Sequence, residues 1–240
     1  KLADVHFVST EKARIRVLKL GENPKFVFNT GCPSIDIAKN VINSTQNIDF
    51  IEKYNGIGEK LTLKKNNYLV VMYHPETNKY TKSKDQIKIL LNAIIDLNLP
   101  TIWFWPNVDA GSDGISKGIR MYREEKKLSN VRFYKNMDTK DFLLLLHNSS
   151  CLIGNSSVGI REGSFLGTPV VNIGDRQKNR ERGANTIDVP CNSQKIKKAV
   201  IESQKMQRQS QHIYGDGNAG ERMVKILAEI KFDINKVLSY

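Results

Sequence analysis

Residues 151–174, with the sequence CLIGNSSVGIREGSFLGTPVVNIG, decide the fold of this chain. Short apolar runs at residues 151–153 and 169–173 indicate two strands, and the residues between them indicate a small-residue turn followed by a helix over residues 158–166. A helix that begins directly after a strand leaves several backbone N–H groups without partners and directs the positive end of its dipole at the turn. A phosphate is the usual ligand of such a turn.

The side chains at this turn suit a nucleotide. Ser156 and Ser157 supply hydroxyl donors beside Gly154 and Asn155. Glu162 follows one helical turn later, where its carboxylate can accept hydrogen bonds from ribose hydroxyls. The alternative is that one of the two serines only caps the helix and that Glu162 lies in solvent.

The same alternation of strand and helix extends over most of the chain. Apolar runs typical of strands occur at residues 68–73, 101–105, 131–134, 152–153, 170–173 and 186–189. Helical periodicity occurs at residues 83–97, 116–127, 139–146, 158–166, 193–207 and 219–230. This order predicts an α/β fold with a Rossmann-type parallel sheet and helices on both faces.

The beginning of the chain predicts a second, smaller part. Residues 1–36 indicate a strand at 5–9, a helix at 11–20, a strand at 26–30 and a turn at 31–33, and the polar residues 37–66 indicate a helix followed by a linker. We therefore expect the remnant of a second α/β domain with its linker in residues 1–60. The larger domain, closed by the last helix, occupies residues 61–240.

Polar residues follow the predicted strands, at the sheet edge where ligands of parallel α/β sheets bind. His74 can hydrogen-bond a phosphate or act as an acid or base, or it can be a structural histidine. Arg176 can clamp a phosphate, or it can be a solvated surface residue. Asp109 and Ser112 can shape a loop that touches a sugar, or they can belong to a plain turn.

Composition narrows the classes of function. The 240 residues carry a formal net charge of +12, but the lysines are dispersed along the chain, which argues against nucleic-acid binding; a basic surface also attracts phosphorylated metabolites. No apolar run approaches the ~20 residues that cross a bilayer, so we expect no membrane partner. Three widely spaced cysteines indicate neither a disulfide framework nor a zinc site and favour a reducing cytoplasm.

Phosphate-binding and dinucleotide-binding signatures of other families are missing. The sequence has no Gly-x-x-x-x-Gly-Lys-Ser/Thr loop and no Gly-x-Gly-x-x-Gly after a strand, which argues against a P-loop NTPase and a nicotinamide enzyme. No metal-ligand spacing stands out either. We expect neither a cofactor nor a metal.

Five segments, in this order along the chain, together resemble the UDP-N-acetylglucosamine 2-epimerases. They are YHP at 73–75, PNVDAGS at 106–112, GNSSVGIRE at 154–162, GTPVVNIGDRQ at 167–177 and IYGDGNA at 213–219, and HFVST at 6–10 and TGCPS at 30–34 fit the same family. The resemblance is to the hydrolysing branch, which makes N-acetylmannosamine or a relative for sialic-type acids. The non-hydrolysing branch usually carries a different loop at 107–112 and a Ser-Gly-Gly type turn at 155–158.

The resemblance implies a two-domain fold like that of GT-B glycosyltransferases, with a UDP-sugar between the domains. By motif, Ser156 and Ser157 would hold the diphosphate, and Glu162 would bind the ribose hydroxyls. Asn155 and Gly154 are also expected among the substrate-binding residues. The backbone near Met137 would meet the uracil. Arg176 and His74 would line the phosphate and sugar end, with His74 as the catalytic candidate.

The reaction implied is an anti-elimination of UDP through a glycal, followed by addition of water with inversion at C2 of the sugar. The family's N-terminal half supplies most of the acid/base carboxylates, and this sequence holds only its last strands. We therefore expect a fragment that is inactive, or nearly so, by itself. The full-length protein is expected to be a homo-oligomer, a dimer or a tetramer.

Two other classes share the phosphate turn. A GT-B glycosyltransferase would also use the turn and a ribose-binding Glu, but the loop at 107–112 and the ending at 214–219 favour the epimerase. A non-catalytic nucleotide-sugar-binding protein would bind UDP tightly without turnover. The sequence leaves open whether the sugar is N-acetylglucosamine or a 2,4-diacetamido-6-deoxy relative.

Overall fold

Six parallel strands form the central sheet, in the order β5-β4-β3-β6-β7-β8. The structure is a computed structural model that describes residues 2–42, 44, 48–76, 81–125 and 128–231. The strands are β3 (Leu69–Met72), β4 (Thr101–Phe104), β5 (Val131–Tyr134), β6 (Cys151–Gly154), β7 (Val170–Ile173) and β8 (Thr186–Val189). The chain builds outward from β3 to β5 and then crosses back to β6 on the other side of β3. The order therefore reverses between β3 and β6, and ligands bind beyond the carboxyl ends of strands at such a point.

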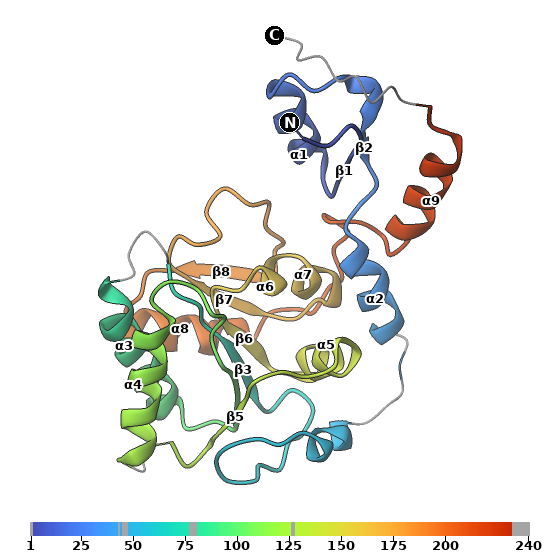
Figure 1. The fold of residues 1–240 in the computed structure, drawn as a ribbon. Helices are drawn as coiled ribbons and strands as arrows, with labels where there is room; N and C mark the ends of the chain where they lie inside the picture. Colours follow the sequence, from blue (N-terminus) through green and yellow to red (C-terminus); the bar gives the residue numbers. More distant parts are fainter. Residues whose placement is uncertain (1, 43, 45–47, 77–80, 126–127, 232–240) are drawn as a thin grey trace.

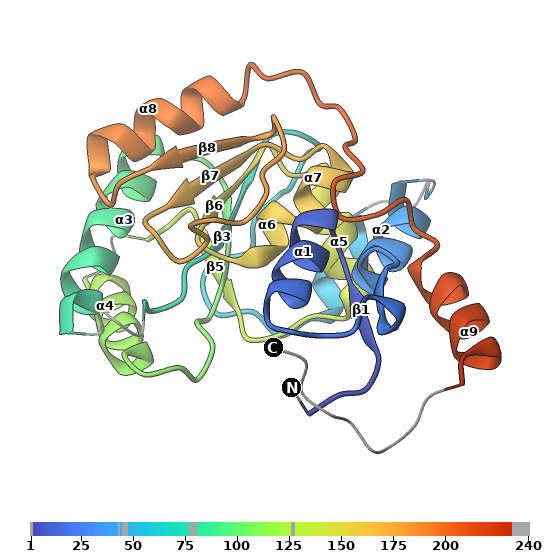
Figure 2. The same ribbon diagram turned by 90° about the horizontal axis from the view of Figure 1, so that it is seen from above.

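Helices cover both faces of this sheet (Figures 1 and 2), which confirms the predicted α/β class. One face carries α3 (Ser83–Leu97), α4 (Ser112–Glu124) and α8 (Ser193–Ser203). The other carries α2 (Pro33–Ile42), α5 (Thr139–Asn148), α6 (Ser157–Ile160) and α7 (Glu162–Leu166). The strands read as continuous apolar runs because their side chains enter a core on either side. On β3, Leu69 and Val71 join the core under α3, whereas Val70 joins the core under α5.

A small unit precedes the large sheet. It consists of β1 (His6–Val8), α1 (Glu11–Lys19), the 3₁₀ helix η1 (Pro24–Phe26) and β2 (Val27–Asn29). β1 and β2 pair in parallel as a separate two-stranded sheet. As expected for a helix that starts at Glu11, Thr10 caps α1 by accepting the N–H of Ala13 at 3.1 Å.

α2 lies between the small unit and the large sheet, and α9 (Ala219–Glu229) packs beside α2 on the outer side of the molecule (Figure 1). A second 3₁₀ helix, η2 (Ile48–Lys53), follows α2. α2 packs on α5 and α7, so it belongs to the core of the larger unit. Asp36 on α2 also accepts the N–H groups of Ala219 and Gly220, at 2.9 and 2.7 Å, and so caps α9. The division at residue 60 stays a prediction.

Some predicted helix limits are wrong. The helix predicted at residues 158–166 is two short helices, α6 and α7, that meet at Arg161. Gly159 and Gly163 let this segment lie directly on Val170, since an added Cβ would approach that side chain to 2.9 and 3.4 Å. α2 begins at Pro33, where we predicted a turn, because proline suits the first turn of a helix.

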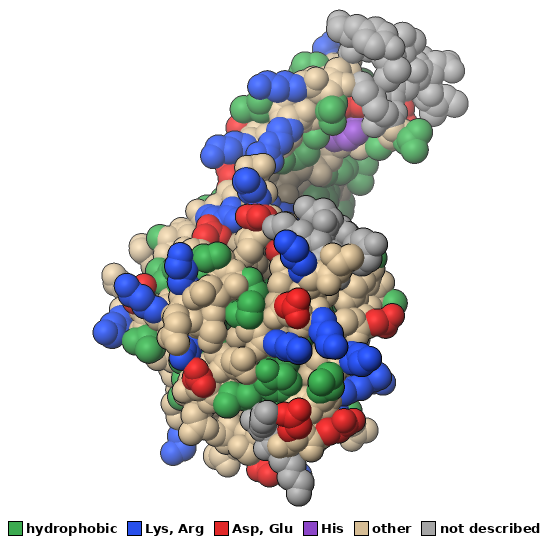
Figure 3. All heavy atoms as spheres, turned by 90° about the vertical axis from the view of Figure 1, so that its left-hand side faces the viewer, with side chains coloured by type: hydrophobic (Ala, Val, Ile, Leu, Met, Phe, Trp, Pro, Cys, Tyr) green, Lys and Arg blue, Asp and Glu red, His purple; other side chains and the backbone are tan. Residues whose placement is uncertain are grey.

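Other helices keep their place with shifted ends. α4 begins at Ser112 instead of residue 116, and residues 126–127 of that prediction lie outside the described ranges. α8 ends at Ser203 instead of residue 207. Within the described ranges no helix is both long and apolar enough to cross a membrane. On the face drawn in Figure 3, Lys and Arg alternate with Asp and Glu, so the positive charge is not gathered into one patch there.

Candidate functional site

The tips of β3 and β6 are joined by one asparagine, at the point where the strand order reverses. The backbone N–H of His74 donates to Asn155 Oδ1 at 2.8 Å, and Asn155 Nδ2 donates to the carbonyl of His74 at 2.8 Å. The backbone N–H of Asn155 donates to the carbonyl of Met72 at 3.1 Å. Asn155 therefore holds the residue that follows β3 at both of its backbone polar groups.

The tip of β7 joins the same asparagine. The carbonyl of Asn155 accepts Arg176 Nη1 at 3.2 Å and Gln177 Nε2 at 2.9 Å. We call His74, Asn155, Arg176 and Gln177 the switch-point cluster. It unites the ends of three neighbouring strands, so two of the predicted phosphate-end residues, His74 and Arg176, do lie together.

The His74 imidazole is buried and uncharged at neutral pH. Its Nδ1 accepts the backbone N–H of Asn107 at 3.2 Å. Burial lowers the pKa of His74 to about 4; Arg176 lowers this pKa further, while Asp109 acts in the opposite direction. The neutral ring therefore carries its hydrogen on Nε2 and is a hydrogen-bond donor.

The loop between β4 and α4 meets the cluster through its acidic residue. Asp109 Oδ2 lies 3.7 Å from Arg176 Nη2, and both side chains are partly exposed. The backbone N–H of Ser112 donates to the carbonyl of Asp109 at 3.0 Å, and Ser112 is the first residue of α4. The structure thus places Asp109 at the cluster and Ser112 one turn away from it.

Gly154 allows the close approach of β6 to β3. Its φ is +142°, and a Cβ at this position would lie 2.0 Å from the carbonyl oxygen of Met72. No side chain fits there. The role of Gly154 in the structure is to let the backbone at the turn pass next to β3.

The second half of the site is the α6–α7 segment, by which we mean Ser156, Ser157, Arg161 and Glu162. Ser156 caps α6 through its hydroxyl, 3.4 Å from the N–H of Val158. Arg161 Nη2 lies 3.5 Å from both Ser157 Oγ and Glu162 Oε1. The serine pair thus holds both a capping residue and a hydroxyl that faces an arginine.

Glu162 does not lie in solvent, since the residue is only 5% exposed. Its Oε2 is buried and has no hydrogen-bond partner among the described residues. A buried carboxylate oxygen without a partner is costly, by roughly 1–3 kcal/mol or more. A hydrogen-bond donor that reached this oxygen would satisfy it.

Met137 lies further along the sheet edge, after β5. Its backbone N–H donates to Asn136 Oδ1 at 2.9 Å, and its buried side chain shares an apolar core with Ile160 of α6. Among the described residues, no hydrogen bond or ion pair joins Met137 to the switch-point cluster. Its proposed meeting with uracil stays a prediction.

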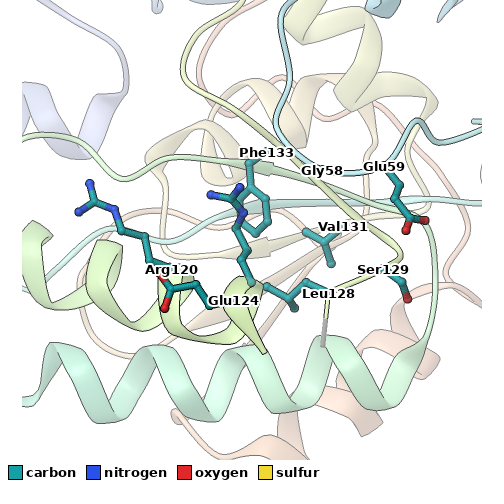
Figure 4. Close-up of a pocket in the computed structure, with 9 residues that line it drawn as sticks. Gly58, Glu59, Arg120, Glu124, Leu128, Ser129, Val131 and Phe133 are labelled. Carbon is teal, nitrogen blue, oxygen red and sulfur yellow. The ribbon is translucent and has the colours of Figure 1, made fainter. Parts of the chain in front are cut away.

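Of two surface pockets, one lies away from the predicted site residues and the other reaches the sheet edge beside Arg176. A pocket of ≈ 530 Å³ lies beside β5, lined by Gly58, Glu59, Arg120, Arg123, Glu124, Leu128, Ser129, Val131 and Phe133 (Figure 4). It contains none of the predicted site residues and lies toward the amino end of β5. A second pocket, of ≈ 450 Å³, reaches the tips of β7 and β8 and includes Gly174 and Asp175, directly before Arg176.

Sequence reasoning gave no role to four residues that organise the site: Glu76, Asn107, Arg161 and Gln177. Glu76 Oε1 lies 3.4 Å from the N–H of Asp175, so it ties the segment after β3 to the tip of β7. All four stand within three residues of a predicted site residue, and this is the signal that could have found them. In the part of the chain that is described, no group of three His, Cys, Asp or Glu could hold a metal ion.

Comparisons with known proteins find relatives over most of the chain. The family model described as UDP-N-acetylglucosamine 2-epimerase matches residues 1–228. The UDP-N,N'-diacetylbacillosamine 2-epimerase (hydrolyzing) of Legionella pneumophila is 31% identical over 244 residues, covering 100% of this chain and 62% of that protein. The polysialic acid biosynthesis protein P7 of Escherichia coli is 35% identical over 207 residues, covering 85% of this chain and 50% of that protein.

Solved structures show the same fold. The UDP-GlcNAc 2-epimerase of Methanocaldococcus jannaschii, in complex with UDP-GlcNAc and UDP, matches with a TM-score of 0.71 at 18% identity, covering 94% of this chain and 61% of that one. The expected GT-B-like fold is thereby confirmed. This chain spans between about half and 62% of the length of the curated relatives described above. On the strength of the family model and of the identity shared along its whole length, the chain belongs to the UDP-N-acetylglucosamine 2-epimerase family.

Proposed function

We propose that this chain is the nucleotide-binding part of a hydrolysing 2-epimerase that converts a UDP-linked 2-acetamido sugar and water into UDP and a free N-acetylmannosamine-type sugar. The observation that carries the proposal is the buried, unpartnered Oε2 of Glu162 beside a turn with two hydroxyls. It has the chemistry to accept ribose hydroxyls. The hydrolysing type is supported by the Legionella pneumophila relative, whose name states it.

The roles follow the two halves of the site. Ser156 and Ser157 hold the diphosphate, at the turn that Gly154 lets pass close to β3. Glu162 holds the ribose. The backbone at Met137 meets the uracil, which places the base toward β5 and the sugar toward the switch-point cluster.

At the sugar end, UDP departs by elimination. A base takes the proton from C2 of the sugar, the bond from C1 to the diphosphate oxygen breaks, and its electron pair leaves with UDP. Water then adds across the double bond of the glycal with inversion at C2. Arg176 and the Nε2–H of His74 stabilise the charge that develops on the leaving diphosphate. Asp109, through Arg176, and Ser112 shape the loop on the sugar side.

The base itself is expected outside this chain, in the part of the relatives that the chain does not span. For the same reason we expect the chain alone to bind UDP and to turn over little or nothing. The full-length protein would be a cytoplasmic homo-oligomer, a dimer or a tetramer, without metal or cofactor.

The test is NMR on the full-length protein mixed in turn with UDP-N-acetylglucosamine and with UDP-N,N'-diacetylbacillosamine. Phosphorus signals report free UDP, and anomeric proton signals report the sugar. UDP together with a free manno-configured sugar is the expected result, and the faster substrate identifies the sugar. A manno-configured sugar still attached to UDP would make the enzyme non-hydrolysing, and binding without turnover of either substrate would overturn the proposal.

A further inference from the structure

Both ends of the Asn155 amide have hydrogen-bond partners inside the protein. Oδ1 accepts the N–H of His74 and Nδ2 donates to the carbonyl of the same residue, both at 2.8 Å. The residue is 0% exposed. Each end of the amide has a partner inside the protein, and no part of the side chain is exposed to a substrate.

We propose that Asn155, which the sequence motif places among the substrate-binding residues, is a positioning residue that sets His74 and Arg176 against the leaving diphosphate. The proposal rests on the function proposed above. It differs from the sequence expectation in one respect: the side chain of Asn155 touches no atom of the UDP-sugar.

The position of the imidazole is fixed from two directions. The Asn155 amide pins the backbone of His74 at its N–H and its carbonyl. The backbone N–H of Asn107, after β4, occupies Nδ1 at 3.2 Å. In the neutral ring the hydrogen is then on Nε2, so the ring presents a donor of fixed direction.

Arg176 depends on the same residue. Its Nη1 donates to the carbonyl of Asn155 at 3.2 Å, and Gln177 Nε2 donates to that oxygen at 2.9 Å. A shift of the backbone at Asn155 therefore moves the donor on His74 and the cation on Arg176 together. Misplacement of catalytic groups by about 1 Å can cost about 100-fold in rate.

The first measurement uses the unmodified full-length protein without ligand. The Nδ2 hydrogens of Asn155 should exchange slowly with solvent, and long-range proton–nitrogen NMR of the His74 ring should show hydrogen on Nε2 and none on Nδ1. Fast exchange at Asn155, or hydrogen on Nδ1, would overturn the proposal. This measurement needs no substrate, so it tests Asn155 even if neither UDP-sugar is turned over.

The second measurement compares Asn155→Ala with Asn185→Ala. Asn185 is also buried and also donates through Nδ2 to a carbonyl, that of Thr168 at 2.7 Å, but it precedes β8 at the opposite edge of the sheet. Per folded molecule, we expect Asn155→Ala to lower kcat by about 100-fold, with a smaller change in the Kd for UDP and altered ring signals of His74. Asn185→Ala should stay within about twofold of the unmodified enzyme, because none of its hydrogen bonds among the described residues reaches the switch-point cluster.

Two results would overturn the assignment. The first is a kcat for Asn155→Ala equal to that of Asn185→Ala, since the role would then be structural only. The second is an unchanged kcat with a raised KM and Kd, which would make Asn155 a binding residue. Should Asn155→Ala fail to fold, the exchange and ring measurements on the unmodified protein decide. An inactive unmodified enzyme would instead count against the proposed function.

Discussion

The switch-point cluster and the α6–α7 segment both start from the end of β6, yet they differ in how their polar groups are hydrogen-bonded. In the cluster, Asn155 makes hydrogen bonds of 2.8 to 3.2 Å to the neighbouring strand tips. In the segment, Arg161 approaches Ser157 and Glu162 only to 3.5 Å, and one oxygen of Glu162 has no partner. The Asn155 amide has partners at both of its ends, whereas Oε2 of Glu162 has none; within the cluster, Oε1 of Gln177 also has no partner among the described residues.

The difference shows how the two halves would serve a nucleotide sugar. A hydrogen-bonded framework holds charged and polar groups in place before the reaction, which is what electrostatic stabilisation of a leaving group requires. Unpartnered groups, in contrast, gain most from a ligand that supplies the missing hydrogen bonds. The cluster therefore suits the reacting end of the substrate, and the segment suits the nucleoside.

The largest expected effect comes from a substitution at Gly154, where β6 ends and both the cluster and the segment begin. Gly154→Ala would put a Cβ 2.0 Å from the carbonyl oxygen of Met72, at a φ of +142°. We expect a loss of about 4 kcal/mol or more in the free energy of unfolding, measured by urea denaturation. The matched control is Gly114→Ala on α4, where the nearest atom lies at 3.5 Å and alanine should stabilise the helix by about 0.5–1 kcal/mol. Equal stability of the two variants would contradict the close approach.

A second prediction concerns how the free energy of unfolding depends on pH through His74 of the switch-point cluster. Burial lowers the pKa of His74 from 6.5 to about 4, so between these values the unfolded chain binds a proton that the folded one does not. The free energy of unfolding is therefore unaffected by His74 above pH 6.5 and falls by up to about 3 kcal/mol as the pH drops to 4. His74→Gln should reduce the slope of unfolding free energy against pH in this window. An identical slope in both proteins would show that His74 titrates normally.

A third prediction sharpens the nucleoside half. Ser157→Ala and Glu162→Ala should each weaken UDP binding by about 1–3 kcal/mol in calorimetry, the cost of losing charge-assisted hydrogen bonds. Glu162→Gln should also weaken UDP binding, because a neutral amide accepts hydrogen bonds less strongly than a carboxylate. Unchanged affinity in both alanine variants would refute the assignment of this segment to the nucleotide.

The smallest effect is expected at the rim of the cluster. Asp109 and Arg176 lie 3.7 Å apart with 37% and 28% of their side chains exposed, so solvent screens the pair. Asp109→Ala should change the free energy of unfolding by at most about 1 kcal/mol. A loss as large as that of Gly154→Ala would mean that the loop before α4, and not the backbone at β6, holds the cluster together.

The accuracy of the sequence prediction depended on how local each signal is. β5 and α3 have the predicted limits, Val131–Tyr134 and Ser83–Leu97, because an apolar run and a helical period are written into consecutive residues. The break at Arg161 was not predicted, because it depends on the close packing of Gly159 and Gly163 on Val170. That contact is between α6–α7 and β7, and the hydrophobic periodicity of the helical segment alone does not indicate it.

The sequence by itself determined the alternation of strands and helices, and therefore the parallel sheet and the edge at which its polar residues gather. It also determined the family, through motifs spread over the whole chain. Only the tertiary structure decided which polar groups are already satisfied: the amide of Asn155 is, and Oε2 of Glu162 is not. The physical reason is that hydrogen bonding and burial depend on partners from other strands, which meet only when the chain crosses back from β5 to β6.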